Sequence, residues 1–376
     1  MRSKIIYLDN NATTQLAPEV LQAMHADLSD VPLNPSSIHP YGIKAKNLLL
    51  KAKDCIAKHF SIGQEKILFT SGGTESLNHA ILGFLEGKKS GHILTTATEH
   101  PAIYNLINAL SKKGFEVSWL DVESSGQVSV ETVRQAIKEN TSLMVFSWVN
   151  TETGVINNVE ALAALAKQQH IPLVIDGIGA LGKLDVSFYD GISALCFSAH
   201  KIHGPKGIGM TLIQSKAYTP QLLGGPQENS LRAGTENLAG ILGFAKAIEL
   251  LKDQNQFTSI MQQLKDLFET KLKQKLLTIE INGNNPRICN TSNIYFPNIS
   301  AETLLIQLNL QGVYASYGSA CASGFFSPSR ILLNMGMDKR RALGSVRFSL
   351  SRYTTNEEIE RAVTIIERTV KALQAI

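Results

Sequence analysis

The sequence predicts an α/β protein with a large domain built on a mostly parallel sheet and a smaller α+β domain. Between about residues 60 and 215, short apolar or β-branched runs alternate with helical patterns, which is typical of βαβ crossovers and of a sheet covered on both faces. After a glycine-rich stretch near 224–240, long helices flank short strands. The length of 376 residues also exceeds the usual size of one hydrophobic core.

The large domain is expected to contain strands separated by amphipathic helices. The strand-like runs lie at 66–70, 92–97, 115–120, 143–149, 172–176, 194–199 and 208–213. The helical patterns begin at Thr74, after Pro101, near Val130 and at Val159. Ligands of such sheets bind at the carboxyl ends of the strands, so candidate site residues are sought there.

The C-terminal part predicts a second unit, with helices near 258–276 and 356–374 and strands near 278, 292 and 346. Thr355 and Glu358 form a capping box at the start of the last helix. We expect a large domain at 16–255 and a small domain that combines 1–15 with 256–376. The first fifteen residues carry no pattern that assigns them to an element.

Composition excludes several classes of protein. The longest apolar runs, such as 161–166 and 171–175, are far shorter than the roughly 20 residues that span a bilayer. Asp9 interrupts the N-terminus before an apolar region of signal-peptide length develops. The net charge of +4 is too mild to suggest nucleic-acid binding. We therefore expect a cytoplasmic protein that binds neither membranes nor nucleic acid directly.

The chain has four cysteines, which are widely separated and form no CxxC pair: Cys55, Cys196, Cys289 and Cys321. This spacing favours reduced thiols and predicts no metal site. Cys321 is unusual because it lies in "SYGSACASGFF" (316–326), among small residues, whereas buried cysteines usually have large apolar neighbours. The glycines of this stretch permit many backbone conformations, so we expect a mobile loop.

Two residues at strand ends point to pyridoxal 5'-phosphate (PLP). Asp176 ends the run "PLVID", and Lys201 follows "ALCFSA" in "FSAHKIHGPKGIGM". PLP chemistry requires a lysine that forms a Schiff base and a carboxylate that keeps the pyridine nitrogen protonated. Taken alone, Lys201 also fits an exposed turn, and His200 beside it also fits a structural role.

A phosphate site is predicted by "TSGGTESLNHAILG" (70–83), in which small residues and a threonine precede a helix whose first N–H groups can face an anion. Ser198 adds a hydroxyl from the strand before the lysine. A Gly-Gly-Thr sequence before a helix also occurs in ordinary capped loops, so this motif is weak by itself.

Further motifs follow in order along the chain: "DNNATT" (9–14), "NPSSIH" (34–39), "TEHPAI" (98–103), "VNTETGVI" (149–156), "RAGTEN" (232–237) and "GSVRFSLSRYTT" (344–355). Together with the lysine and aspartate motifs, they resemble the cysteine desulfurases of the NifS/IscS-like branch, which have the class V aminotransferase fold of PLP-dependent transferase fold type I. The resemblance runs from about Tyr7 to past Arg352.

The resemblance implies a role for each matching residue at the cofactor. Lys201 corresponds to the Schiff-base lysine, Asp176 to the partner of the pyridine nitrogen, and His100 to the histidine that stacks on the ring and shuttles protons. Asn150 corresponds to the residue that reaches the ring hydroxyl and the substrate. The phosphate contacts correspond to Gly73, Thr74, Ser198 and His200, and to Thr235, which the family lends to the neighbouring subunit of a homodimer.

The resemblance also implies the reaction. Arg347 corresponds to the arginine that binds the carboxylate of L-cysteine, for which a planar guanidinium is suited, and Asn34 to a further substrate contact. Cys321 corresponds to the loop cysteine that takes the sulfur as a persulfide, leaving alanine. That persulfide passes to an acceptor protein, which docks near the Cys321 loop, for the synthesis of iron-sulfur clusters, other sulfur-containing cofactors or thiolated tRNA.

The sequence departs from the family pattern in three places. Gly179 replaces a glutamine that hydrogen-bonds the cofactor ring oxygen, and the loss of one such bond costs on the order of 1 kcal/mol. Asn229 and Ser230 stand where relatives commonly have Arg-Gly, near the expected dimer contact. Phe325 and Phe326 follow the cysteine loop, where they either dock an acceptor or pack the loop base onto the small domain.

Two other functions are alternatives to the cysteine desulfurase hypothesis. One is a selenocysteine lyase or another class V enzyme such as an aminotransferase, which the long interval between Cys321 and Arg347 disfavours. The other is a non-catalytic homologue that serves as a binding platform, motivated by Gly179 and the altered 226–230 segment. Retention of the reactive groups argues against the second: Lys201, Asp176, His100, Cys321 and Arg347.

Overall fold

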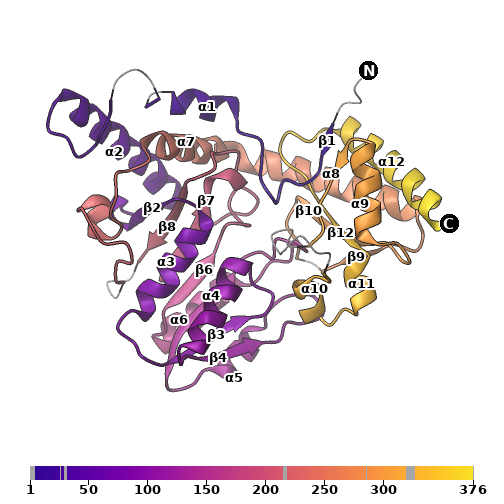
Figure 1. Ribbon diagram of the computed structural model, residues 1–376, viewed down its shortest axis with the longest axis horizontal. Coiled ribbons are helices and arrows are strands. Elements are labelled where there is room, and N and C mark those ends of the chain that lie inside the picture. The colour runs from indigo at the N-terminus through magenta and orange to yellow at the C-terminus, as the bar shows by residue number, and fades with distance from the viewer. Residues whose placement is uncertain are drawn as a thin grey trace.

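The protein consists of a large α/β part and a smaller α+β part that lie side by side (Figure 1). A computed structural model describes residues 5–25, 27–28, 32–214, 218–284, 286–318 and 327–375. No helix within these ranges is long and apolar enough to cross a membrane. The same ranges contain no group of three or more histidine, cysteine, aspartate or glutamate side chains that could hold a metal ion.

The described residues of the large part form a seven-stranded sheet, as the alternating pattern predicts. Its spatial order is β2 (Ile67–Thr70), β8 (Gly209–Ile213), β7 (Ala194–Ser198), β6 (Leu173–Asp176), β5 (Thr141–Ser147), β3 (His92–Thr96) and β4 (Glu116–Leu120). The strands from β7 to β4 are parallel to one another, whereas β8 runs antiparallel to both of its neighbours. The prediction of a mostly parallel sheet is therefore confirmed.

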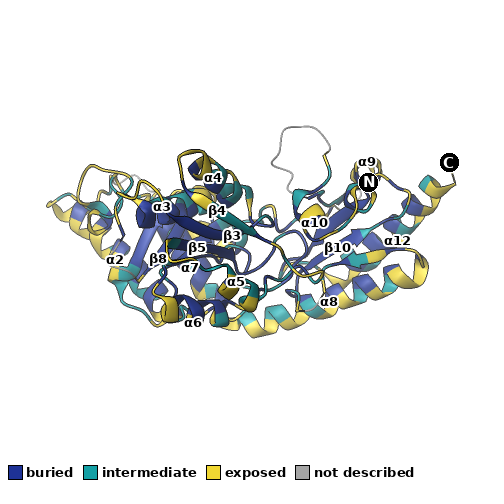
Figure 2. Ribbon diagram, turned by 90° about the horizontal axis from the view of Figure 1, so that it is seen from below, coloured by how far each residue is buried: buried dark blue, intermediate teal, exposed yellow. Residues whose placement is uncertain are grey.

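Helices cover both faces of this sheet, which explains why its central strands β6, β7 and β3 are buried along their whole length and are mainly apolar (Figure 2). One face packs on α3 (Gly73–Leu85) and α4 (Pro101–Lys112). The other face packs on a second group of helices: α2 (Pro40–Phe60), α5 (Val130–Ala136), α6 (Val159–Gln169) and α7 (Leu238–Glu249). Helix α1 (Pro18–Met24) packs against α7.

The smaller part has its own apolar core. Its antiparallel sheet has the order β12 (Ser345–Ser349), β10 (Thr291–Tyr295) and β9 (Glu280–Asn282). Helices α8 (Gln254–Lys275), α9 (Ala301–Leu310) and α12 (Asn356–Gln374) enclose that core. The capping box of Thr355 and Glu358 forms as expected. The domain boundaries at 15/16 and 255/256 stay a prediction.

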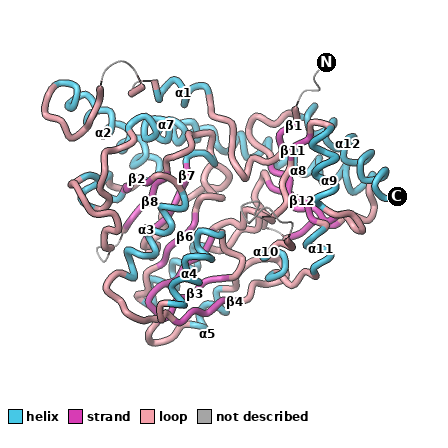
Figure 3. Tube along the Cα trace, viewed as in Figure 1, coloured by secondary structure: helices cyan, strands magenta, loops and turns pink. Residues whose placement is uncertain are grey.

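Several elements had no counterpart in the sequence pattern. The N-terminal segment supplies β1 (Ile6–Tyr7), which pairs in parallel with β11 (Val313–Tyr314), and Ile6 and Leu8 are buried in the core of the smaller part. A loop then leads to α1 (Figure 3). The remaining short helices are α10 (Arg330–Asn334), α11 (Lys339–Leu343), η1 (Gln64–Lys66), η2 (Ala199–Lys201), η3 (Gln227–Ser230) and η4 (Leu250–Asp253).

Candidate active site

Asp176 and Lys201 come from neighbouring parallel strands, as their positions at strand ends predict. Asp176 is the last residue of β6, and Lys201 ends the turn η2 that directly follows β7. Asp176 is only 6% exposed, and the amide of Ile178 donates to its Oδ1 at 2.9 Å. Burial raises the pKa of Asp176 to about 6, although the Ile178 hydrogen bond and the charge of Lys201 oppose that shift.

Lys201 is held by the N-terminal segment. Its Nζ donates to the backbone carbonyl of Asn11, and to that of Ala12 at 2.9 Å. The same segment is fixed to η2, because Thr14 Oγ1 donates to the carbonyl of His200 at 2.9 Å. The sequence gives "DNNATT" no role of its own within the family pattern, whereas these contacts give it a structural role beside the lysine.

The expected phosphate site gathers at the start of α3. The helix begins at Gly73, and its first N–H groups have no carbonyl partner within the helix. A Cβ added to Gly73 would lie 2.4 Å from Cδ1 of Ile178, so a larger residue there would require the end of the Ile178 side chain to move. Thr74 is exposed, and no hydrogen bond of the Ser198 hydroxyl occurs within the described residues. These groups are chemically suited to an anion.

His200 lies beside this site but its ring is already engaged. Its Nδ1 is 3.1 Å from Oγ1 of Thr13. Burial, together with the charges of Lys201, Lys206 and Lys183, lowers the pKa of His200 to about 4. The imidazole is therefore neutral at neutral pH, and its second nitrogen is the one that could contact a phosphate.

His100 caps the first turn of α4, where its Nδ1 accepts a hydrogen bond from the amide of Ala102 at 3.1 Å. Burial of the ring, followed by the charges of Lys201 and Arg330, lowers the pKa of His100 to about 4 even though the residue retains an exposed surface. The positive charge of Lys201 contributes to the pKa shifts of both His100 and Asp176.

Asn150 is buried and mainly shapes the turn that follows β5. Its Oδ1 accepts hydrogen bonds from the amides of Glu152 and Thr153 at 3.0 and 3.1 Å. Its Nδ2 contacts the carbonyl of Thr98 at 3.4 Å. The side-chain oxygen is thus occupied by the protein, so any cofactor contact of Asn150 would have to use the amide nitrogen.

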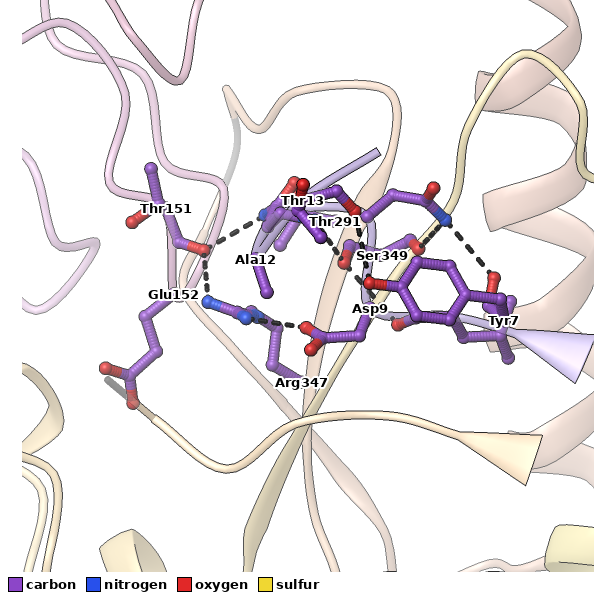
Figure 4. Close-up of polar contacts among 12 residues, drawn as sticks. Tyr7, Asp9, Ala12, Thr13, Thr151, Glu152, Thr291, Arg347 and Ser349 are labelled. Atoms are coloured by element: carbon purple, nitrogen blue, oxygen red, sulfur yellow. Dashed lines mark hydrogen bonds and ion pairs between the residues drawn. The ribbon is translucent and has the colours of Figure 1, made fainter. Parts of the chain in front are cut away.

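Arg347 lies on β12, and its side chain points toward the loop that carries Thr151 and Glu152 (Figure 4). Its Nη2 forms an ion pair with Asp9 at 2.8 Å, and its Nη1 donates to the carbonyl of Thr151 at 3.2 Å. Its Nε is buried and has no acceptor among the described residues. The guanidinium is therefore held in place by Asp9 while it keeps N–H groups for a carboxylate.

Two predicted site residues lie away from these contacts. Asn34 is exposed beside an open groove of about 720 Å³, and the amide of Ser36 donates to its Oδ1 at 2.9 Å. Thr235 is exposed in the loop before α7. In the same loop, Arg232 donates to both carboxylate oxygens of Glu75 in the first turn of α3, at 2.9 and 3.4 Å. No local sequence pattern predicts this ion pair, because the two residues are 157 positions apart.

Cys321, Phe325 and Phe326 lie outside the described residues. On one side of them, Ser316 exchanges backbone hydrogen bonds with Arg347 at 2.8 and 3.0 Å. On the other side, Ser329 donates to the buried carboxylate of Glu152 at 2.8 Å. The chain therefore leaves and re-enters the described structure close to the Arg347 strand.

The positions that depart from the family pattern differ in the space around them or in their backbone conformation. A Cβ added to Gly179 would lie 3.0 Å from Cγ2 of Thr151, so a glutamine there would require this neighbour to move. Asn229 and Ser230 have φ values of 58° and 62°, a left-handed conformation that glycine adopts more readily than serine.

The three other cysteines lie in helices, strands or the segments next to them. They are unpaired: Cys55 is partly buried in α2, Cys196 is buried in β7 and Cys289 is buried before β10. Burial raises the pKa of Cys289 to about 11 and that of Cys196 still further. Burial also raises the pKa of Cys55 above its ordinary value, so none of the three is a reactive thiolate at neutral pH.

Comparison with known proteins agrees with the geometry. Residues 6–362 match the family described as aminotransferase class V. A cysteine desulfurase of Nostoc sp. (strain PCC 7120) is 38% identical over 99% of this chain and 94% of its own length, and the cysteine desulfurase IscS of Dictyoglomus turgidum is 37% identical over 99% and 96%. A solved NifS-like protein superimposes with a TM-score of 0.91 at 33% identity, covering 98% of this chain and all of its own.

Proposed function

Because the chain belongs to the class V aminotransferase family and, within it, to the PLP-dependent cysteine desulfurases, we propose that its sulfur acceptor inside the enzyme is Cys321. L-Cysteine would lose its sulfur to the Cys321 thiolate, forming a persulfide, while the carbon skeleton leaves as alanine. The assignment of the site is supported by the placement of Asp176 and Lys201 on adjacent strand ends. It is also supported by the contacts of Arg347 and Lys201 with the same N-terminal segment, at Asp9 and Asn11 respectively.

The side chains present suit PLP. Asp176 is a buried carboxylate with one donor on Oδ1, and its Oδ2 has no donor among the described residues, which leaves an acceptor for a protonated pyridine nitrogen. Lys201 would carry the cofactor through its amine. The α3 N-terminus, Ser198 and His200 would hold the phosphate. When bound, PLP supplies an electron sink that weakens bonds at the substrate's α-carbon.

The residues around this site would bind the substrate, move its α-proton and accept its sulfur. Arg347, oriented by Asp9, binds the substrate carboxylate and fixes which bond of the α-carbon faces Lys201. The Lys201 amine, once free of the cofactor, is the group positioned to move the α-proton. Cys321 must be deprotonated to attack sulfur, and the substrate amine is one base that could take its proton.

The activity is tested directly by incubating the purified holoenzyme with L-cysteine and a dithiol reductant. Alanine and sulfide should appear in equal amounts, because each persulfide reduced corresponds to one alanine released. Alanine without sulfide, or transfer of the amino group to a keto acid, would contradict the proposal and favour another class V reaction.

We further propose that the enzyme is a homodimer that works in the cytoplasm and passes its sulfur to an acceptor protein. The unpaired state of the described cysteines supports a reducing compartment. The relatives named IscS suggest an acceptor in iron-sulfur cluster assembly. Support for the dimer comes from large apolar side chains that are exposed in the large part: Ile38, Tyr41, Ile43, Leu222 and Leu223.

Substitution of Leu223 by aspartate is expected to yield a monomer that binds PLP roughly 10-fold or more weakly. Leu223 is 86% exposed, so the change should disturb association and not folding. The loss of affinity follows if Thr235 donates to the partner's phosphate, since a hydrogen bond to a charged group is worth about 1.5–3 kcal/mol. Light scattering and PLP titration measure the two effects.

Leu277→Asp provides the matched control, because Leu277 is 89% exposed on the small part, distant in sequence from Thr235. It should remain dimeric with unchanged PLP affinity. A Leu223→Asp variant that stays dimeric, or a monomer that binds PLP as tightly as the parent, would refute the proposed interface or the role of Thr235, respectively.

A further inference from the structure

Arg330 connects the smaller part to the helix that carries His100. It is the first residue of α10, and Ser329 caps that helix while donating to Glu152. Its Nη2 donates to the carbonyl of Glu99 at 2.6 Å, and its guanidinium carbon lies 3.9 Å from the ring centroid of Tyr104. These two contacts lie on either side of His100 in the sequence, so Arg330 braces the first turn of α4.

The contacts of His100 determine which of its nitrogens carries hydrogen. Nδ1 accepts the amide hydrogen of Ala102 at 3.1 Å, so it cannot itself be protonated in this conformation. A neutral imidazole has one N–H, which must then lie on Nε2. Protonation of Nδ1 would break the cap of α4 and place a positive charge at the positive end of the helix dipole.

The surrounding charges act in the same direction. Burial is the main factor that keeps the pKa of His100 low, and the positive charges of Lys201 from η2 and Arg330 from α10 add to it. The other titratable groups beside it are Glu99, whose pKa burial raises to about 7, and Tyr104. The negative charge that could favour an imidazolium is thus weakened, because the carboxyl group of Glu99 is largely neutral below pH 7.

We propose that Arg330 is a positioning residue for the desulfurase reaction, which fixes His100 as a neutral imidazole that offers an Nε2–H donor to the site and does not accept a proton. This inference rests on the proposed function only in placing His100 at the cofactor. A consequence is that His100 is not the base that deprotonates Cys321. That proton must leave through another group, of which the substrate amine is one.

The test compares Arg330→Met with Arg330→Lys in the holoenzyme, using ¹⁵N-labelled histidine and NMR, with the His100 signal assigned by a His100→Gln variant. The parent should show the Nε2–H tautomer and stay neutral to about pH 5. In Arg330→Met the pKa of His100 should rise by about one unit, the lower end of the range for a nearby charge. Arg330→Lys, which keeps the charge, should restore most of the parental value.

Activity provides a second readout and separates the two proposals. The acidic limb of the kcat profile should move upward by about one pH unit in Arg330→Met, whereas Arg340→Met, an exposed change on α11, should leave it in place. A parental Nδ1–H tautomer, or an unchanged His100 pKa with kcat reduced equally at every pH, would overturn the inference and leave Arg330 a purely structural anchor. Absence of desulfurase activity in the parent would instead refute the proposed function, whatever the NMR result.

Discussion

Replacing Cys321 by alanine should reduce sulfide release from L-cysteine by at least about 1000-fold, which is the scale of loss when a nucleophile is removed. PLP should remain bound, with its visible absorbance intact, because the groups expected to hold it belong to other segments. Lys201 and Asp176 come from β7 and β6, and their contacts involve the N-terminal segment and Ile178. Addition of L-cysteine should still change the cofactor spectrum, since Arg347 and Lys201 are unaltered.

Cys55→Ala is the control for loss of a thiol. Cys55 lies in α2, and its Sγ is 3.7 Å from the carbonyl of Ala245 in α7, and neither residue is assigned to the reaction. This variant should keep parental rates of alanine and sulfide formation. Sulfide formation at parental rates by Cys321→Ala would show that another thiol, or the substrate itself, accepts the sulfur.

The second large effect is expected for Asp176→Asn. Asparagine has the same shape and can still accept the Ile178 amide hydrogen, but it cannot stabilise a protonated pyridine nitrogen. The chemical step should therefore slow by roughly 1000-fold, the magnitude typical of losing one strong electrostatic contact. Single-turnover absorbance measurements with L-cysteine would separate this slowing from weaker cofactor binding.

The same substitution should stabilise the protein without cofactor at high pH. The pKa of Asp176 is about 6 in the folded protein and 3.8 ordinarily, so the folded state binds the proton more tightly. Stability from this group is complete below about pH 4 and is lost as the pH rises through 6. Asparagine removes that loss, which amounts to as much as about 3 kcal/mol above pH 6.

Denaturant unfolding of the apoprotein at pH 5 and pH 8 measures this difference. Asp190→Asn is the control, because Asp190 is exposed and paired with Lys167 at 2.6 Å. Relative to the parent, the control should show no larger free energy of unfolding at pH 8 than at pH 5. Equal stability of Asp176→Asn and the parent at pH 8 would contradict the prediction, because it would mean that the ionised Asp176 carboxylate does not destabilise the folded protein.

The main sheet was predictable because each of its strands has a recognisable local sequence pattern. The runs ending at Asp176 and Ser198 are continuous and apolar, since both faces of these strands are buried, and the helices between them follow regular spacing. The last helix was equally clear from its capping box. By contrast, β1 and β11 have two residues each, too few to display any period.

The arrangement of the site was only partly predictable, for a physical reason. Asp176 and Lys201 could be paired because a parallel sheet brings strand ends together. Arg347 and Asp9 are 338 residues apart, and nothing in either local sequence signals their ion pair. Arg330 likewise contacts Glu99 across 231 residues. Such contacts depend on how the two parts of the molecule meet, which no local pattern encodes.

The hydrogen bonds between the N-terminal segment and Lys201 affect when the enzyme can first bind its cofactor during synthesis. The Asn10 side chain donates to the backbone carbonyl of Ser349, and the Asn11 amide donates to the Ser349 hydroxyl. Ser349 ends β12, which is the last described strand in the sequence, so the segment that holds the Lys201 amine is itself held by a strand that is synthesised late. A nascent chain that has completed the large sheet still lacks this fastening. Cofactor loading should consequently be a late event, delayed until translation has passed β12.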